Sequence, residues 1–211
     1  MKKIIGLVLG VSMAFSLGAG FTACGGEEER AFKNVIVVIG DGMGENHLLN
    51  TLEYFDLQTP AFMKDQCGYI GTDSLSGTTD SAAAGTALAT GTKVENGKIA
   101  KHNSEDLKQI TSIAQKAKMK TGVITTDTLD GATPAAFSAH AESRGFTQQI
   151  IKTQAESNID LLLGRWSSEY TNRSYEFTDV GYTMTATEED LLAAKDAQKL
   201  VGLLPDIDSV P

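Results

Sequence analysis

Short apolar runs alternate with helical patterns along this chain, and this alternation constrains the fold more than any other feature. The runs Val35–Ile39, Thr121–Thr126 and Leu200–Leu204 have the length and the branched residues of buried strands. Helical patterns lie between them, for example over residues 45–54 and 107–118. Strands that alternate with helices form parallel sheets covered on both faces. The sequence therefore predicts an α/β fold with a mostly parallel central sheet between helical layers.

The remaining segments complete this pattern. We expect short strands at residues 69–72 and 160–163, and a helix that begins near Pro134. Further helices are expected at residues 81–89, 146–157 and 188–195. Residues 93–103 are interpreted as a polar, mobile segment and residues 166–187 as irregular. The apolar face of the helix at 107–118 is expected to carry Ile110, Ile113, Ala114 and Ala117.

Composition restricts the classes of function. The 211 residues carry a formal charge of −9, and 41% of them are hydrophobic. A strongly acidic surface argues against nucleic acid as a partner. The dispersed charges and the apolar content indicate a globular domain rather than a disordered chain.

Ser81 is the first candidate for chemistry. It follows Asp80 and begins a run of alanines and other small helix-forming residues. The first turn of a helix has backbone N–H groups without intrahelical partners, which can hold an anion while a serine hydroxyl attacks an electrophile. An Asp-Ser helix start is, however, more often only a structural cap.

Asp41 is the second candidate. It lies between Gly40 and Gly42 directly after the apolar run Val35–Ile39. Ligands of open α/β sheets collect at the carboxyl ends of strands, so this carboxylate is placed to bind a metal ion. The simpler alternative is a turn residue between glycines.

Thr133 and Arg144 are the third and fourth candidates. Thr133 offers a neutral oxygen ligand of the kind that a hard cation accepts, although it could equally cap a helix. Arg144 offers a planar fork that matches two phosphate oxygens, although most arginines are solvated surface cations.

Three ordered motifs together resemble the alkaline phosphatase family. They are Gly40-Asp41-Gly42-Met43-Gly44, Thr79-Asp80-Ser81-Ala82-Ala83 and Ala132-Thr133-Pro134-Ala135-Ala136, with His140 and Ser143-Arg144 following. Three motifs in the right order are far more specific than one. The resemblance runs from Asn34 toward the C-terminus and weakens after Gly145. It implies an alkaline-phosphatase-like α/β/α sandwich, present here in incomplete form.

The resemblance also implies a chemistry, which is hydrolysis of small phosphate monoesters with two Zn²⁺ ions and one Mg²⁺ ion. Ser81 would be the nucleophile and a metal ligand, and Asp41 would bridge a zinc and the magnesium. Thr133 would belong to the magnesium shell, Arg144 would clamp the phosphoryl oxygens, and Asp80 would orient Arg144 or nearby backbone. No histidine lies near Ser81 in the sequence, which favours activation of the hydroxyl by a metal. Family members are often homodimers.

One position departs from the family pattern. Gly131 stands two places before Thr133, where the family usually has an acidic residue or histidine. Asp127 or Asp130 could act on the magnesium through water, or the site could be altered.

Zinc ligands are the larger discrepancy. The chain has three histidines, His47, His102 and His140, and none stands in a spacing typical of a zinc site. In the family most zinc ligands come from the second half of the chain. We interpret residues 33–211 as the N-terminal part of a longer phosphatase, with little activity alone. The alternatives are a zinc-less surface lipoprotein that binds phosphate or a partner, and a phosphodiesterase or sulfatase relative.

The N-terminal sequence predicts where the protein is located. Lys2 and Lys3 precede the apolar stretch Ile4–Gly20, and Phe21-Thr22-Ala23-Cys24 resembles a bacterial lipoprotein cleavage site. We expect residues 1–23 to be a signal peptide, Cys24 to be lipidated and residues 24–32 to be a tether. The domain would then be exported and anchored to the membrane, facing the periplasm or the cell exterior. An ordinary signal peptide and a single membrane-spanning anchor are the alternatives.

Overall fold

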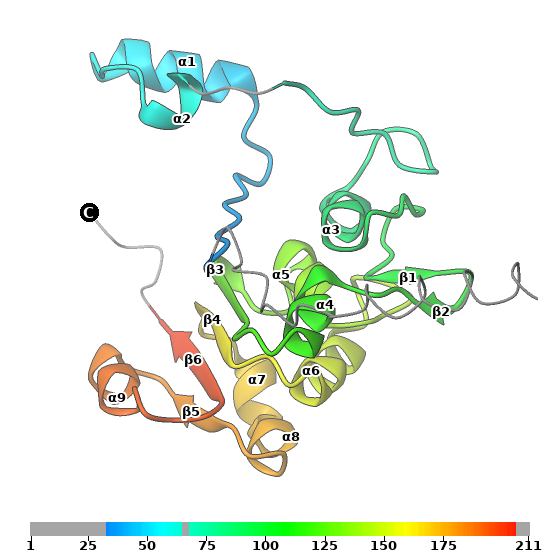
Figure 1. The fold of residues 1–211 in the computed structure, drawn as a ribbon, viewed down its shortest axis with the longest axis vertical. Helices are drawn as coiled ribbons and strands as arrows, with labels where there is room; N and C mark the ends of the chain where they lie inside the picture. Colours follow the sequence, from blue (N-terminus) through cyan, green and yellow to red (C-terminus); the bar gives the residue numbers. More distant parts are fainter. Residues whose placement is uncertain (1–32, 65–67, 206–211) are drawn as a thin grey trace, which may run out of the picture. The chain divides into compact units, whose positions relative to one another are not determined.

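The structure is a computed structural model that describes residues 33–64 and 68–205 (Figure 1). The described residues fall into two units, residues 33–39 and residues 40–205. The second unit begins with two helices, α1 (Glu45–Tyr54) and α2 (Ala61–Lys64). The helix expected at residues 45–54 is therefore confirmed. The predicted signal peptide, the Cys24 anchor and the tether lie outside the described residues.

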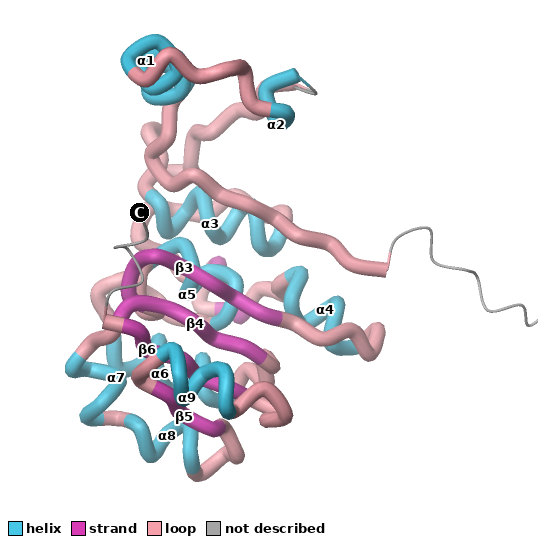
Figure 2. Tube along the Cα trace, turned by 90° about the vertical axis from the view of Figure 1, so that its left-hand side faces the viewer, coloured by secondary structure: helices cyan, strands magenta, loops and turns pink. Residues whose placement is uncertain are grey.

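A parallel sheet of four strands organises the second unit. Its strands are β3 (Gly122–Thr128), β4 (Leu161–Arg165), β5 (Thr183–Thr185) and β6 (Leu200–Leu204), in the spatial order β3-β4-β6-β5. Figure 2 shows these strands side by side. Their register aligns all carboxyl ends at one edge, because every neighbouring pair is parallel. The predicted α/β class with a mostly parallel sheet is confirmed.

One face of this sheet packs on the main hydrophobic core. The helices there are α6 (Thr147–Glu156), α7 (Ser168–Asn172) and α8 (Ser174–Thr178), which bury Ile151, Tyr170 and Phe177 against the sheet residues Leu162 and Val201. The Tyr170 and Phe177 rings stack with their centroids 5.8 Å apart. The helix α9 (Glu188–Ala193) approaches the opposite face, where its Leu191 lies next to Gly202.

A second, alanine-rich core joins the helices that carry the site. The helix α3 (Ser81–Thr90) packs on α5 (Ala132–Ser138), and their buried alanines cluster with Ile99 and Ile150. The contact is close, because a Cβ atom added to Gly85 would lie 3.0 Å from the Ala136 Cβ. Small side chains therefore set the distance between the two helix starts. Alongside lie the short antiparallel strands β1 (Lys101–His102) and β2 (Glu105–Asp106), and the helix α4 (Ile110–Lys116).

Two predicted strands are not formed. Residues 34–40 and 68–73 have no regular secondary structure. The side chains of Val35–Ile39 are exposed, with Ile36 at 85% and Val38 at 89%, and Tyr69 and Ile70 are exposed as well. An extended segment becomes a strand only when its backbone groups pair, and these segments belong to neither sheet of the described residues.

Three further expectations need correction. The helix expected at 107–118 is shorter, and its apolar residues Ile110 and Ile113 are exposed instead of facing the core. Residues 166–187 are not irregular, because they form α7, α8 and β5. Residues 93–103 are not simply polar loop, because Val94 and Ile99 are fully buried. In each case tertiary packing decides what the local pattern leaves open.

The described helices include none with the length and apolar character needed to cross a lipid bilayer.

Candidate active site

Asp41 is the centre of a group of hydrogen bonds from distant parts of the chain. Its Oδ1 accepts a hydrogen bond of 3.1 Å from the Ser81 hydroxyl, and its Oδ2 accepts one of 2.7 Å from the Thr133 hydroxyl. Ser81 is the first residue of α3, and Thr133 lies in the first turn of α5. The structure thus brings together the three residues that the sequence predicts as metal ligands.

The position of Ser81 follows from the local sequence. Asp80 is the N-cap of α3, with an extended backbone, and its carboxylate accepts a hydrogen bond of 2.9 Å from the Ala83 N–H. This is the preferred use of aspartate at a helix start, because it satisfies one of the unpaired N–H groups. The alanines that follow favour the helix. Ser81 is therefore held in the first turn with its side chain half-buried.

The second oxygen of Asp80 connects the helix start to Arg144. Asp80 Oδ2 accepts a hydrogen bond of 3.0 Å from the Gly97 N–H and lies 3.4 Å from the Arg144 guanidinium. Burial raises the pKa of the Asp80 carboxyl, but the hydrogen bonds from Ala83 and Gly97 and the charge of Arg144 together lower this pKa below its ordinary value. The Asp80 carboxylate thus contacts both the start of α3 and the Arg144 guanidinium.

The turn Asn96-Gly97 also shapes the site, and the sequence reasoning missed it. The Asn96 side chain accepts a hydrogen bond from the Asp80 N–H and donates one to the Thr78 carbonyl. Gly97 has φ of +85° and accepts a 2.7 Å hydrogen bond from the Arg144 N–H. Asn-Gly is a strong turn signal, so the turn could have been found, but its partners are 16 or more residues away.

The oxygen atoms of Asp41, Ser81 and Thr133 suit a hard cation better than they suit zinc. A carboxylate and two hydroxyl groups are ligands that a hard cation such as Mg²⁺ accepts. Zinc in catalytic sites prefers three protein ligands drawn from histidine, carboxylate and thiolate. Across residues 33–64 and 68–205, no three His, Cys, Asp or Glu side chains are grouped to hold a metal. The described residues alone therefore do not make up a zinc site.

The three histidines make contacts with residues other than Asp41, Ser81 and Thr133. His47 accepts a hydrogen bond from the Gly44 N–H at the start of α1, and a ring nitrogen of His140 lies 2.9 Å from the Leu107 carbonyl oxygen. His102 Nδ1 lies 3.9 Å from the Glu95 carboxylate.

Gly131 is the N-cap of α5, and a neighbouring carboxylate takes the space that a side chain would need there. A Cβ atom at position 131 would lie 2.8 Å from Asp127 Oδ2 and 2.9 Å from the Thr128 carbonyl oxygen. The other oxygen, Asp127 Oδ1, accepts hydrogen bonds from Arg165 and from the Thr128 N–H. Asp130 instead contacts Thr147, and its Oδ1 is buried without a partner. Of the two carboxylates considered from sequence, Asp127 is the one that lies over position 131.

Comparison with known proteins decides the family. The alkaline phosphatase family profile matches residues 32–163, which carry all three motifs. The chain belongs to the alkaline phosphatase family. It is 35% identical over 204 residues to Alkaline phosphatase 4 of Bacillus subtilis (strain 168), a match that covers 85% of this chain and 43% of that protein.

Solved structures of alkaline phosphatases share the fold. The enzyme from the Antarctic bacterium TAB5 superposes with a TM-score of 0.67 at 30% identity, covering 74% of this chain and 49% of that one. The cold-active enzyme from the psychrophile Shewanella sp. gives a TM-score of 0.67 at 32% identity, covering 79% and 45%. The chain thus spans about half the length of these relatives.

Proposed function

We propose that this chain supplies the nucleophile and the phosphate-binding arginine of a phosphomonoesterase site. The observation that supports this proposal is the pair of hydrogen bonds from Ser81 and Thr133 to the single Asp41 carboxylate, with Asp80 and Arg144 held next to Ser81. Small phosphate monoesters are the proposed substrates, by analogy with the family.

Ser81 performs the displacement in this proposal. Its Oγ forms a bond to phosphorus while the bond from phosphorus to the ester oxygen breaks, and the ester oxygen takes up a proton from water and leaves as the alcohol. Water then hydrolyses the phosphoserine. Because the hydroxyl donates to Asp41 Oδ1, the proton is held on the carboxylate side and the lone pairs of the oxygen remain for the phosphorus.

Arg144 binds the phosphoryl group. Its planar guanidinium matches two phosphoryl oxygens, on which charge is spread in a loose transition state. Asp80 leaves part of this fork free, because a single guanidinium nitrogen approaches it at 3.4 Å. The guanidinium is also half-exposed, so a substrate can reach it.

A hard cation would be held by the oxygen atoms of Asp41, Ser81 and Thr133. When bound, it would lower the pKa of the serine hydroxyl and offset the charge of the phosphate. We further propose that Asp127 takes the role in cation binding that a side chain at position 131 would otherwise have, since its Oδ2 lies over that position. Two zinc ions and one magnesium ion remain the proposed metal content of the whole enzyme. They would need ligands in addition to Asp41, Ser81 and Thr133.

Hydrolysis of p-nitrophenyl phosphate with added Zn²⁺ and Mg²⁺ tests the proposal. We expect the 211-residue chain to turn over far more slowly than the ~1–1000 s⁻¹ of ordinary enzymes. Ser81→Ala should abolish this residual activity and Arg144→Gln should reduce it strongly. Arg173→Gln is the control, because Arg173 lies just before α8 and pairs with Glu176 at 2.8 Å instead of with a residue of the site. Activity above background that is equal in Ser81→Ala and the parent chain would exclude the proposed nucleophile, and rapid turnover would exclude the expectation of low activity.

A zinc-less phosphate-binding protein is the second candidate. The observation that favours it is the absence of a metal-binding group of His, Cys, Asp and Glu among the described residues. Metal analysis of the purified chain separates the two. A metal-free protein that binds inorganic phosphate through Arg144 without turnover would support the binder.

Export and anchoring at Cys24 remain proposals. Palmitate labelling of the expressed protein should be lost in Cys24→Ala. An unlabelled parent chain would exclude the anchor. The homodimer is likewise a proposal, which the molar mass in solution would test.

A further inference from the structure

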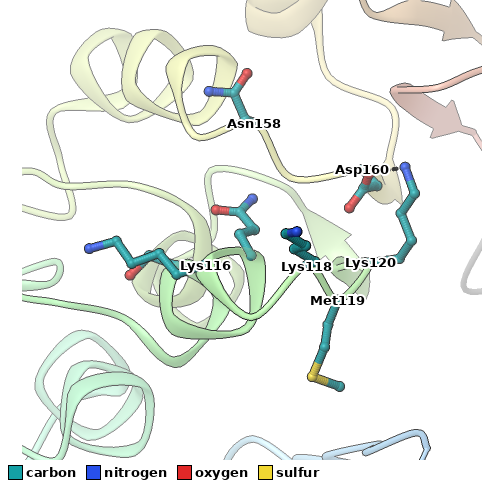
Figure 3. A pocket seen from close by; sticks show the side chains of 8 residues that line it. Lys116, Lys118, Met119, Lys120, Asn158 and Asp160 are labelled. Carbon is teal, nitrogen blue, oxygen red and sulfur yellow. Dashed lines mark hydrogen bonds and ion pairs between the residues drawn. The ribbon is translucent and has the colours of Figure 1, made fainter. Parts of the chain in front are cut away.

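A hollow of about 530 Å³ opens at the opposite edge of the sheet from the site (Figure 3). Lys120 and Asp160 precede the amino ends of β3 and β4, whereas Asp127 and Arg165 lie at the carboxyl ends of the same strands. Three lysines, Lys116, Lys118 and Lys120, line the hollow with Asn158 and Asp160. The size suits a small molecule.

The lysines stand out against the charge of the whole chain. Residues 107–126 contain four lysines and no acidic residue, although the protein carries a formal charge of −9. Figure 3 shows the three lysine side chains spread around the hollow, with only Lys120 turned toward Asp160. The hollow is therefore a local cationic surface on an acidic protein.

Asp160 neutralises only one of these lysines. It accepts hydrogen bonds of 2.6 Å from the Lys120 ammonium and 2.8 Å from the Thr121 N–H. Burial raises the pKa of the Asp160 carboxyl, but these hydrogen bonds and the Lys120 charge together lower it below its ordinary value. Within the described part of the chain, Lys116 and Lys118 make no ion pair with a carboxylate. Their charges remain available.

Lys118 has a backbone conformation that glycine would adopt with less strain. Its φ is +58°, in the left-handed region, directly after the C-cap Ala117 of α4. Its N–H donates to the Gln115 carbonyl, and the Met119 N–H donates to the Ala114 carbonyl, as in a helix end that usually carries glycine. Backbone stability alone would favour glycine at position 118. Replacing Lys118 with glycine therefore removes a possible binding group without removing a stabilising one.

The dipoles of the neighbouring helices do not account for all of the positive charge of the hollow. The ends of α4 and α6 meet at the hollow, and each carries roughly half a negative elementary charge. Three lysines and one aspartate give +2, so about +1 remains after both helix ends are counted. Lys116, in the last turn of α4, is explained in part by this effect. The helix dipoles do not explain Lys118 or the remaining charge of about +1.

We propose that this lysine hollow, lined by Lys116, Lys118 and Lys120, is a second anion site that binds a small oligophosphate. The three lysine side chains are spread around the hollow (Figure 3), and an anion with several phosphates carries more charge to meet them than a single phosphate ion does. The site is independent of Arg144 and Ser81, which lie with the loops and helix starts of the proposed phosphatase site.

Titration calorimetry of the 211-residue chain with sodium tripolyphosphate at low salt tests the site. Lys116→Gln and Lys118→Gly should each weaken binding about two- to fivefold, the range for exposed ion pairs. Lys118→Gly should also raise the melting temperature by about 2–4 °C, because it relieves the left-handed strain. Lys152→Gln, an exposed lysine of α6 that does not line the hollow, should leave affinity and melting temperature unchanged. Arg144→Gln should retain the binding, which keeps this test separate from the proposed phosphatase function.

Four results would overturn the proposal. They are unchanged affinity in Lys118→Gly, an equal loss in Lys152→Gln, loss of tripolyphosphate binding in Arg144→Gln, and inorganic phosphate binding to Arg144→Gln as tightly as tripolyphosphate does. Lysine-dependent binding to vesicles of phosphatidylglycerol without binding of tripolyphosphate would assign the hollow to a membrane surface instead, and would also overturn it.

Discussion

Replacing Asp80 with alanine should destabilise the protein and loosen Arg144 together. The carboxylate accepts hydrogen bonds from the Ala83 and Gly97 N–H groups and pairs with the Arg144 guanidinium. Asp80→Ala removes all three contacts at once, so it tests whether one side chain both begins α3 and positions the arginine.

The size of the effect follows from these contacts. Loss of an N-cap costs about 1 kcal/mol. The Gly97 N–H loses a charged acceptor in a partly buried position, which adds roughly 1–2 kcal/mol. The ion pair adds less than about 1 kcal/mol, because the Asp80 and Arg144 side chains are 26% and 47% exposed. We expect a total loss of about 2–4 kcal/mol in the free energy of unfolding.

Urea unfolding followed by circular dichroism measures this loss, and Thr187→Ala is the matched control. Thr187 caps α9 through a 3.1 Å hydrogen bond from the Asp190 N–H, far along the chain from Arg144. Thr187→Ala should cost about 1 kcal/mol and leave inorganic phosphate binding unchanged. Asp80→Ala should weaken phosphate binding as well. Equal destabilisation in the two variants, with phosphate binding unchanged in both, would refute the dual role of Asp80.

The effect should depend on pH with a definite sign. The folded-state pKa of Asp80 lies below its ordinary value of 3.8, so the folded state favours the ionised form. The stabilisation is therefore complete above about pH 3.8 and is lost as the pH falls through the lower folded-state pKa. The difference between the parent chain and Asp80→Ala should be constant from pH 7 to 5 and should shrink in stronger acid. A difference that grows in acid would contradict this reasoning.

Three further predictions concern the metal site and the two cores. Asp127→Asn should reduce the rise in melting temperature on addition of Mg²⁺, because it removes the charge of the carboxylate that lies over position 131; an unchanged rise would exclude Asp127 from the site. Gly85→Val should destabilise by about 1–3 kcal/mol in urea unfolding, because its Cβ would lie 3.0 Å from that of Ala136, whereas Ala84→Val on the less buried side of α3 should cost less. Gln154→Leu should cost about 2–4 kcal/mol in the same assay, because the buried Gln154 amide donates 2.8 Å hydrogen bonds to both the Leu129 carbonyl and Ser138 Oγ, which would lose their donor.

The sequence predicts best those elements whose determinants are local. The helix Glu45–Tyr54 and the strand Leu200–Leu204 have the predicted bounds, and α3 begins at Ser81 because Asp80 caps it. Local rules also place Gly97 in a turn, but they do not say that this turn would hold Arg144 through its carbonyl oxygen. That contact depends on chain segments that come together only in the folded structure.

Elements that depend on distant partners are the ones that local patterns misplace. Val35–Ile39 is as apolar as a buried strand, yet a strand forms only where backbone groups find a partner. Residues 166–187 lack a clear period, yet Tyr170 and Phe177 order them by stacking in the core. Gly131 looks like a missing ligand in the sequence, and only the structure shows the Asp127 carboxylate over it.

The alanine-rich contact between α3 and α5 links the fold to the chemistry. Ser81 begins α3 and Thr133 lies in the first turn of α5, and both hydroxyls reach the same Asp41 carboxylate. These hydrogen bonds can form together only if the two helices approach closely, which Gly85 and Ala136 allow. A larger residue at either position would separate the helix starts as well as destabilise the core. The small residues of this contact therefore allow the two hydroxyls to meet at Asp41, and Gly85→Val should weaken the proposed binding of Mg²⁺ in proportion to its effect on packing.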